Sequence, residues 1–135
     1  VGLGVDGSAS NDNSNLMEGV RHALMMNRLI YGASAVTHLD ALRWATEGSA
    51  RCLGREKLGK IAPGYQADLA MFTLDELRFS GAGDPLAALV LCGAHRADRV
   101  MIRGRWTVED GMPVGIDVAR LRHDHGAVAK LFAES

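Results

Sequence analysis

The stretch VGLGVDGSASND, residues 1–12, joins a short apolar run to a carboxylate and then to a small polar turn. An apolar run of this length, followed by Gly and a Ser/Asn/Asp cluster, is typical of a buried parallel strand. In α/β folds the loops at the C-terminal ends of parallel strands carry the chemistry. Residues 1–5 therefore predict a strand that places Asp6 at the functional end of a sheet, which makes Asp6 the first candidate for a catalytic residue.

An alternative role for Asp6 is to cap the helix that follows or to accept hydrogen bonds from loop amides, since Asp is common in turns and caps. The local sequence leaves both roles open. Six other side chains of the same turn offer a cap, namely Ser8, Ser10, Asn11, Asp12, Asn13 and Asn15. Gly7 also allows a sharp turn after Asp6, so that the carboxylate points out of the strand end. Both observations favour the catalytic role.

The composition is that of one globular domain, because 47% of the 135 residues are apolar and 23% are charged. The net charge of −1 gives no reason to expect a nucleic-acid or anionic-membrane partner. No apolar stretch is long enough to span a bilayer, and no signal-peptide pattern is present. Cys52 and Cys92 form no C-x-x-C pair, which predicts buried free thiols in a reducing cytoplasm.

Apolar residues at helical spacing predict helices over 15–31, 37–53 and 118–132. Thr37 and Asp40 have the spacing of a capping box at the start of the second helix. The last helix contains His123-Asp124-His125, and H-x-H is a known metal-binding pattern. On a helix, however, residues two apart point in different directions. This motif therefore predicts a solvated helix face.

Between these helices the pattern changes to strands and turns. Pro63-Gly64 predicts a tight turn, and residues 69–73 predict a strand. Asp84-Pro85 is typical of the first residues of a short helix, with Pro at a first helical position. Residues 98–108 alternate like a β-hairpin whose turn lies near Gly104. The middle of the chain is therefore expected to form a small antiparallel sheet.

Three stretches together resemble the C-terminal part of the amidohydrolase superfamily of metal-dependent (β/α)8 hydrolases. They are GVDGSASN (4–11), GKIAPGYQADL (59–69) and VMIRGR (100–105). The sequence is most similar to the cytosine deaminase-like branch, which includes 8-oxoguanine, guanine and S-adenosylhomocysteine deaminases and triazine hydrolases. The resemblance covers essentially the whole chain, and its first stretch is most similar to the 8-oxoguanine deaminase-like members.

This resemblance implies an α/β fold in three parts. Residues 1–57 would form the last βα segment of a TIM-type barrel with its helices. Residues 58–115 would form the C-terminal part of the small β-sandwich beside the barrel, and residues 116–135 a C-terminal helix. Within the sandwich, Gly64, Ala67 and Asp68 would be structural residues and not catalytic ones.

The resemblance also implies the chemistry. Asp6 would bind one divalent metal ion, zinc or alternatively iron, and would relay a proton from the attacking water to the leaving amine. Ser8, Ser10 and Asn11 would lie near enough to contact the substrate, a small aminated purine-like or triazine ring. The family's other ligands, an H-x-H motif and further histidines, would precede Asp6. Since they are not in the sequence, we expect the C-terminal part of a longer cytoplasmic enzyme that binds no metal and has no activity by itself.

Two other functions stay open at this point. One is a structural or interaction module without catalysis, and the other is a related chlorohydrolase, guanine deaminase or S-adenosylhomocysteine deaminase. A truncated barrel would leave the strands at 1–5 and 69–73 with unpaired edges, which recruit other strands. We therefore expect either a homo-oligomer or coverage by the N-terminal part of the same polypeptide.

Overall fold

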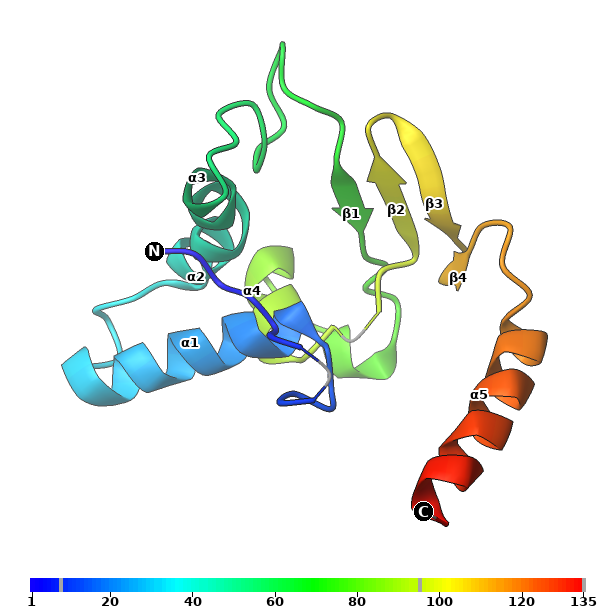
Figure 1. Ribbon diagram of the computed structural model, residues 1–135. Helices are drawn as coiled ribbons and strands as arrows, with labels where there is room; N and C mark the ends of the chain where they lie inside the picture. Colours follow the sequence, from blue (N-terminus) through cyan, green and yellow to red (C-terminus); the bar gives the residue numbers. More distant parts are fainter. Residues whose placement is uncertain (8, 95, 135) are drawn as a thin grey trace.

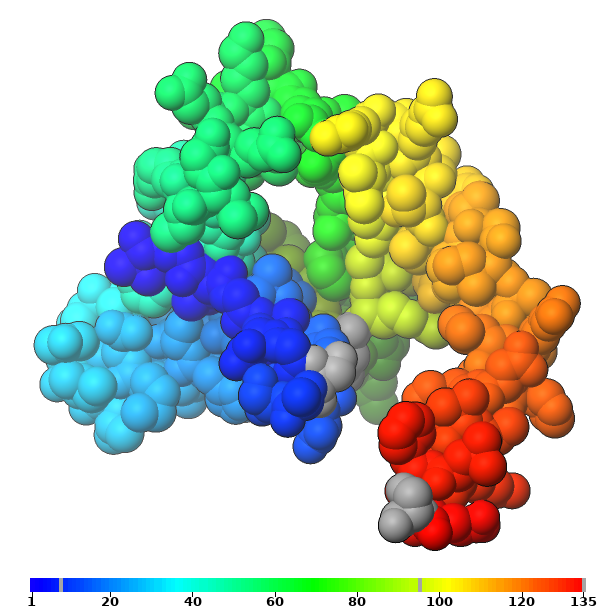
Figure 2. Space-filling model, in the orientation of Figure 1, coloured from blue at the N-terminus to red at the C-terminus, as the bar shows by residue number. Residues whose placement is uncertain are grey.

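The structure is a computed structural model that describes residues 1–7, 9–94 and 96–134. A helical part lies beside a four-stranded antiparallel sheet, and a last helix follows the sheet (Figure 1). Figure 2 shows an opening between the helical part and the sheet, and the last helix extends away from the remainder. Among the described residues, no helix is both long enough and apolar enough to cross a membrane.

The predicted helix boundaries are largely confirmed. The helical part consists of α1 (Leu16–Tyr31), α2 (His38–Arg43), a π-helical turn η1 (Trp44–Gly48), α3 (Ser49–Cys52) and α4 (Pro85–Leu91). The capping box is present, since the Thr37 amide donates to the Asp40 carboxylate at 3.0 Å and the Asp40 amide donates to the Thr37 hydroxyl at 3.2 Å. At α4, the Asp84 carboxylate accepts from two amides of the first turn. Local capping residues thus determine where α2 and α4 begin.

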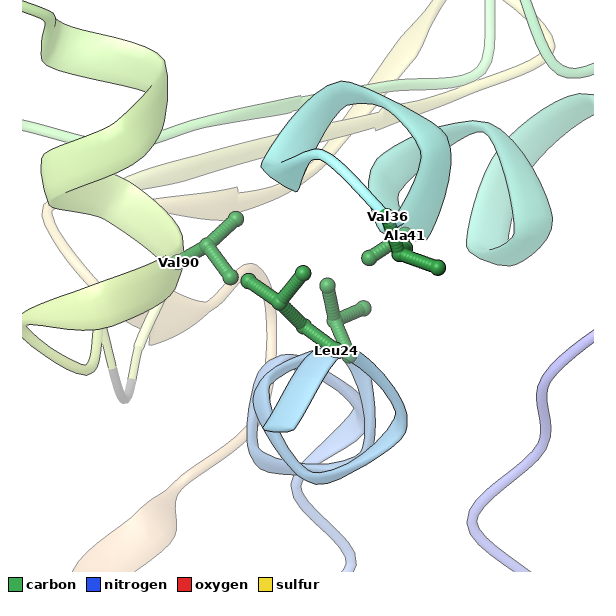
Figure 3. Close-up of a cluster of buried hydrophobic side chains, with 5 residues drawn as sticks. Leu24, Val36, Ala41 and Val90 are labelled. Carbon is green, nitrogen blue, oxygen red and sulfur yellow. The ribbon is translucent and has the colours of Figure 1, made fainter. Parts of the chain in front are cut away.

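The main core lies where α1, α2 and α4 meet (Figure 3). Val20 and Leu24 of α1 are fully buried and face Ala41 of α2, Val36 just before it, and Val90 of α4. α4 lies far from α1 and α2 in the sequence, so burial of this apolar surface is what holds it against them. A second, smaller cluster is formed by Phe79, Ala88 and Ala94.

The four strands form a sheet in chain order, and every neighbouring pair is antiparallel. They are β1 (Leu69–Met71), β2 (Arg99–Ile102), β3 (Arg105–Glu109) and β4 (Met112–Pro113). The predicted hairpin is β2–β3, with Arg103 and Gly104 at φ 50° and 77° in its two-residue turn. The Asp68 carboxylate accepts from the Arg103 amide at 2.7 Å and so ties this turn to β1. That Asp68 is a structural residue and not a catalytic one stays a prediction.

The predicted strand over residues 1–5 is not formed. These residues lie along the helical part without strand pairing in the described chain, and Val1 is 86% exposed. A strand needs neighbouring strands that accept and donate its backbone hydrogen bonds. The sheet that the structure describes contains β1 to β4 alone and does not include residues 1–5.

The expected burial of the two thiols is wrong. Cys52 and Cys92 are free thiols as predicted, but both are exposed, because each lies at the outer end of a short helix. The predicted last helix is α5 (Val118–Ala133), and none of its residues is buried. Its apolar positions follow the helical period, but Leu121 and Leu131 remain 56% and 69% exposed because α5 packs on no other element of the described chain to a notable extent.

Three aspartates that begin elements predict how stability depends on pH. Accepted hydrogen bonds hold the pKa of Asp40, Asp84 and Asp98 below the ordinary value of 3.8, with the Thr37 hydroxyl, the Ala87 amide and the Thr73 amide as the main donors. A lowered folded-state pKa stabilises the fold fully above about pH 4, and this stabilisation is lost as the pH falls through the folded-state value.

We expect the melting temperature to fall between pH 5 and pH 3, and to fall less in Asp84→Asn, because Asn keeps the cap but does not titrate. Thermal melts at pH 7, 5, 4 and 3 measure this. Asp75→Asn, at an exposed position, is the control and should behave like the wild type. An Asp84→Asn profile that is identical to the wild-type profile would contradict the expectation.

Candidate active site

Asp6 lies near the end of segment 1–7, before the polar loop that leads to α1. Its side chain is exposed, and one carboxylate oxygen accepts the Gly7 amide at 2.7 Å. Its backbone has φ 65°, in the left-handed region that Asp adopts more readily than most residues. The chain therefore turns sharply at Asp6, and the carboxylate reaches solvent.

The electrostatics of the loop keep Asp6 ionised. The Gly7 amide lowers the pKa of the Asp6 carboxyl below its ordinary value of 3.8, and the Ser10 hydroxyl lowers it further. At neutral pH the side chain is therefore a carboxylate with free lone pairs. Such a group can accept a proton, bind a cation, or hold a polarised water.

The predicted substrate contacts occupy different places in this loop. Ser10 donates its hydroxyl to the Gly7 carbonyl at 3.2 Å and lies beside Asp6. The side-chain amide of Asn11 forms two hydrogen bonds within the loop. Its Nδ2 donates to the Val5 carbonyl at 2.6 Å, and its Oδ1 accepts from the Asn13 backbone amide at 3.1 Å. Ser8 lies outside the described residues. A substrate role for these three residues stays a prediction.

The described residues alone do not form a metal centre. Among residues 1–7, 9–94 and 96–134, no three His, Cys, Asp or Glu side chains converge in a way that could hold a metal ion. Catalytic zinc sites use three protein ligands and keep one position open. Asp6 has the right chemistry for one ligand. His123 and His125, in turn, are exposed on α5, as the helical position of their motif predicted.

Comparison with known proteins assigns the family. Residues 1–107 match the model of the amidohydrolase family. This chain belongs to the amidohydrolase family. It is 60% identical over 129 residues to 8-oxoguanine deaminase of Pseudomonas aeruginosa, a match that covers 96% of this chain and 29% of the relative. The chain thus spans under a third of the length of the curated relatives that it matches.

Solved structures of amidohydrolases have the same fold over this region. Zinc-bound atrazine chlorohydrolase from Arthrobacter aurescens TC1 superposes with a TM-score of 0.86 at 37% identity, over 94% of this chain and 29% of that one. A zinc-bound adenosine deaminase from Xanthomonas campestris superposes with a TM-score of 0.91 at 27% identity. This match covers 99% of this chain and 31% of that one. These matches confirm the predicted fold class, with a barrel end, part of a small sheet domain and a last helix. The boundaries at 57 and 115 stay predictions.

One residue near the candidate site was missed by sequence reasoning. Ser49, in the first turn of α3, hydrogen-bonds to the backbone of Leu3, three residues before Asp6. The only local signal is the pair of small residues Gly48-Ser49 inside a helix, and nothing in that pair indicates the distant segment that it contacts.

Proposed function

We propose that the natural protein containing this chain hydrolytically deaminates an aminated purine-like or triazine ring, with 8-oxoguanine as its leading substrate. The observation that carries the proposal is the 60% identity to 8-oxoguanine deaminase across the segment with Asp6. The second candidate, hydrolysis of a triazine, is supported by 37% identity to atrazine chlorohydrolase.

In the proposed reaction, the oxygen of a water molecule forms a bond to the ring carbon that bears the amino group. The Asp6 carboxylate accepts a proton from this water and then donates it to the amine nitrogen. The carbon–nitrogen bond breaks and ammonia leaves. Asp6 is ionised at neutral pH, because accepted hydrogen bonds hold its pKa below the ordinary value, so the group enters the cycle as a proton acceptor.

We also propose that the natural protein uses one divalent metal ion, zinc in preference to iron. Two structural neighbours, the atrazine chlorohydrolase and the adenosine deaminase, contain bound zinc. Such an ion supplies the acidity that ionises water near neutral pH. Asp6 would contribute one carboxylate oxygen, and the remaining ligands would come from outside the described residues.

Ammonia release from a panel of ring substrates tests the proposed function. The zinc-loaded natural protein should turn over 8-oxoguanine with a kcat/KM at least about tenfold above that for guanine, adenosine, S-adenosylhomocysteine and atrazine. Preference for atrazine would favour the triazine candidate. Absence of turnover with every compound would overturn the proposed chemistry and favour an interaction module.

We further propose that the protein acts in the cytoplasm on a small molecule and that its exposed apolar faces are covered in the assembled protein. Leu29 and Ile30 of α1 are 78% and 64% exposed, and the outer edge of β1 has no strand partner in the described chain. Exposed apolar surface and strand edges favour association. The cover would be a second copy or another part of the same polypeptide.

Sedimentation of the 135-residue chain tests this association. We expect species larger than 14.4 kDa, because in this preparation no other part of a polypeptide covers α1 or β1. Leu29→Gln with Ile30→Gln should shift the distribution towards the monomer. A compact monomer of 14.4 kDa with a cooperative melt would instead mean that the chain needs no cover.

A further inference from the structure

The segment that carries Asp6 is attached to the helical part by one hydroxyl. The Ser49 hydroxyl oxygen accepts the Leu3 amide at 3.0 Å. Its single proton has two acceptors, the Leu3 carbonyl at 2.8 Å and the Trp44 carbonyl at 3.1 Å. One side chain thus bonds both polar groups of Leu3, as a neighbouring strand would do for part of a ladder.

Two glycines let the backbones approach closely enough for this contact. A Cβ at Gly48 would lie 2.1 Å from the Val1 carbonyl oxygen, and a Cβ at Gly2 would lie 2.9 Å from Cα of Ser49. Neither position can take a side chain without moving the segment away from the helix. Gly48 ends η1, the π-helical turn, and turns of this type are frequent at functional sites. Figure 2 shows the first residues lying across the surface of the helical part.

This contact is coupled to the position of Asp6 by a short length of chain. Three residues span at most about 11 Å, so a displacement of Leu3 is transmitted to Asp6. The Leu3 side chain also packs on the main core, and the Asn11 side chain holds the Val5 carbonyl on the other side of Gly4. Two hydrogen-bonded residues therefore precede Asp6: Leu3, which Ser49 holds, and Val5, which Asn11 holds.

We propose that Ser49 and Gly48 are positioning residues that fix the Asp6 carboxylate in its working place by clamping residues 1–3 onto the helix. This inference rests on the proposed function for its catalytic consequence. The clamp acts on the Leu3 backbone. Its presence can therefore be tested by hydrogen exchange of the Leu3 amide, without measuring turnover.

The test uses the natural protein with Ser49→Ala, Gly48→Ala and a stability control, Phe79→Leu. Phe79 is 5% exposed and belongs to the second core cluster, which does not contain Leu3. Four quantities are measured on each, namely hydrogen exchange of the Leu3 amide, kcat and KM, zinc kept after dialysis against a chelator, and melting temperature.

For Ser49→Ala we expect Leu3 exchange to rise about tenfold and kcat to fall about tenfold, with KM unchanged, because misplacement of a reacting group affects the chemical step. Gly48→Ala should lower kcat about 100-fold, since it displaces the whole segment. Both variants should lose zinc faster than the wild type. Phe79→Leu should lower the melting temperature without changing kcat or Leu3 exchange.

Unchanged Leu3 exchange in Ser49→Ala would overturn the inference, as would faster exchange with an unchanged kcat. If the wild type turns over no substrate, the proposed function fails separately. In that case, hydrogen exchange of the Leu3 amide and zinc retention in Ser49→Ala test the clamp. Faster exchange together with faster zinc loss would support it, and no change in either would overturn it.

Discussion

Replacing Asp6 by Asn in the natural protein is expected to lower kcat for 8-oxoguanine about 1000-fold. Asn keeps the size and shape of Asp, but its amide neither carries the charge nor accepts a proton at neutral pH. The fold should be unaffected, because the Asp6 side chain is exposed and its hydrogen bonds to described residues are with Gly7 and Ser10 of the same loop. Steady-state ammonia release and a thermal melt of the same preparation measure the two effects.

Asp12→Asn is the matched control for this experiment. Asp12 is an exposed aspartate of the same loop, so its substitution makes the same change in net charge near the site. It should keep the wild-type kcat. If Asp6→Asn also keeps it, then Asp6 is a turn residue and the alternative that the local sequence left open is correct.

The backbone at Asp6 has a conformation that few non-glycine residues adopt. A non-glycine residue at φ 65° costs on the order of 1 kcal/mol and persists only where the surroundings require it. Ser14, Arg103 and Asp110 also have positive φ, so this conformation defines the turn at Asp6 and does not by itself assign a function.

The sequence was sufficient for features that depend on a few adjacent residues. Thr37 and Asp40 cap α2 as their spacing predicted, and Asp84-Pro85 begins α4. The hairpin turns at Gly104 because a two-residue turn requires positive φ there. In each case the donor, the acceptor and the backbone preference lie within four residues of one another, so the pattern contains the whole cause.

Features that depend on distant partners could not be read in this way. Residues 1–5 have the composition of a buried strand, but pairing depends on neighbours that the pattern does not contain. The contact of Ser49 with Leu3 joins positions 46 residues apart. The helical period of α5 similarly predicts an apolar face, but which surface covers that face depends on what packs there.

The candidate site was predictable in part for the same reason. Asp6 could be selected from its place after an apolar run, and the structure adds the hydrogen bonds that keep it ionised. Asn11 was selected as a substrate contact, which stays a prediction, and in the structure both ends of its amide form hydrogen bonds within the loop. A polar residue in a functional loop can thus serve the geometry of its neighbour, and local sequence does not distinguish this from contact with a ligand.

The second large effect concerns the 135-residue chain prepared alone, which we expect to hold no stoichiometric zinc and to release no ammonia from 8-oxoguanine above background. One exposed carboxylate does not replace the three protein ligands of a catalytic zinc site, and the described residues offer no cluster of three. Elemental analysis after dialysis and an ammonia assay measure the two quantities, with the natural protein as the positive control.

Asp6→Asn in the isolated chain separates specific binding from chance association. If the chain binds zinc only through scattered histidines and exposed thiols, the small amount bound should be the same in Asp6→Asn and should fall in Cys52→Ser with Cys92→Ser. One zinc per chain that disappears in Asp6→Asn would show the opposite. The ligand set would then be complete within these 135 residues, and the requirement for ligands from elsewhere in the polypeptide would be wrong.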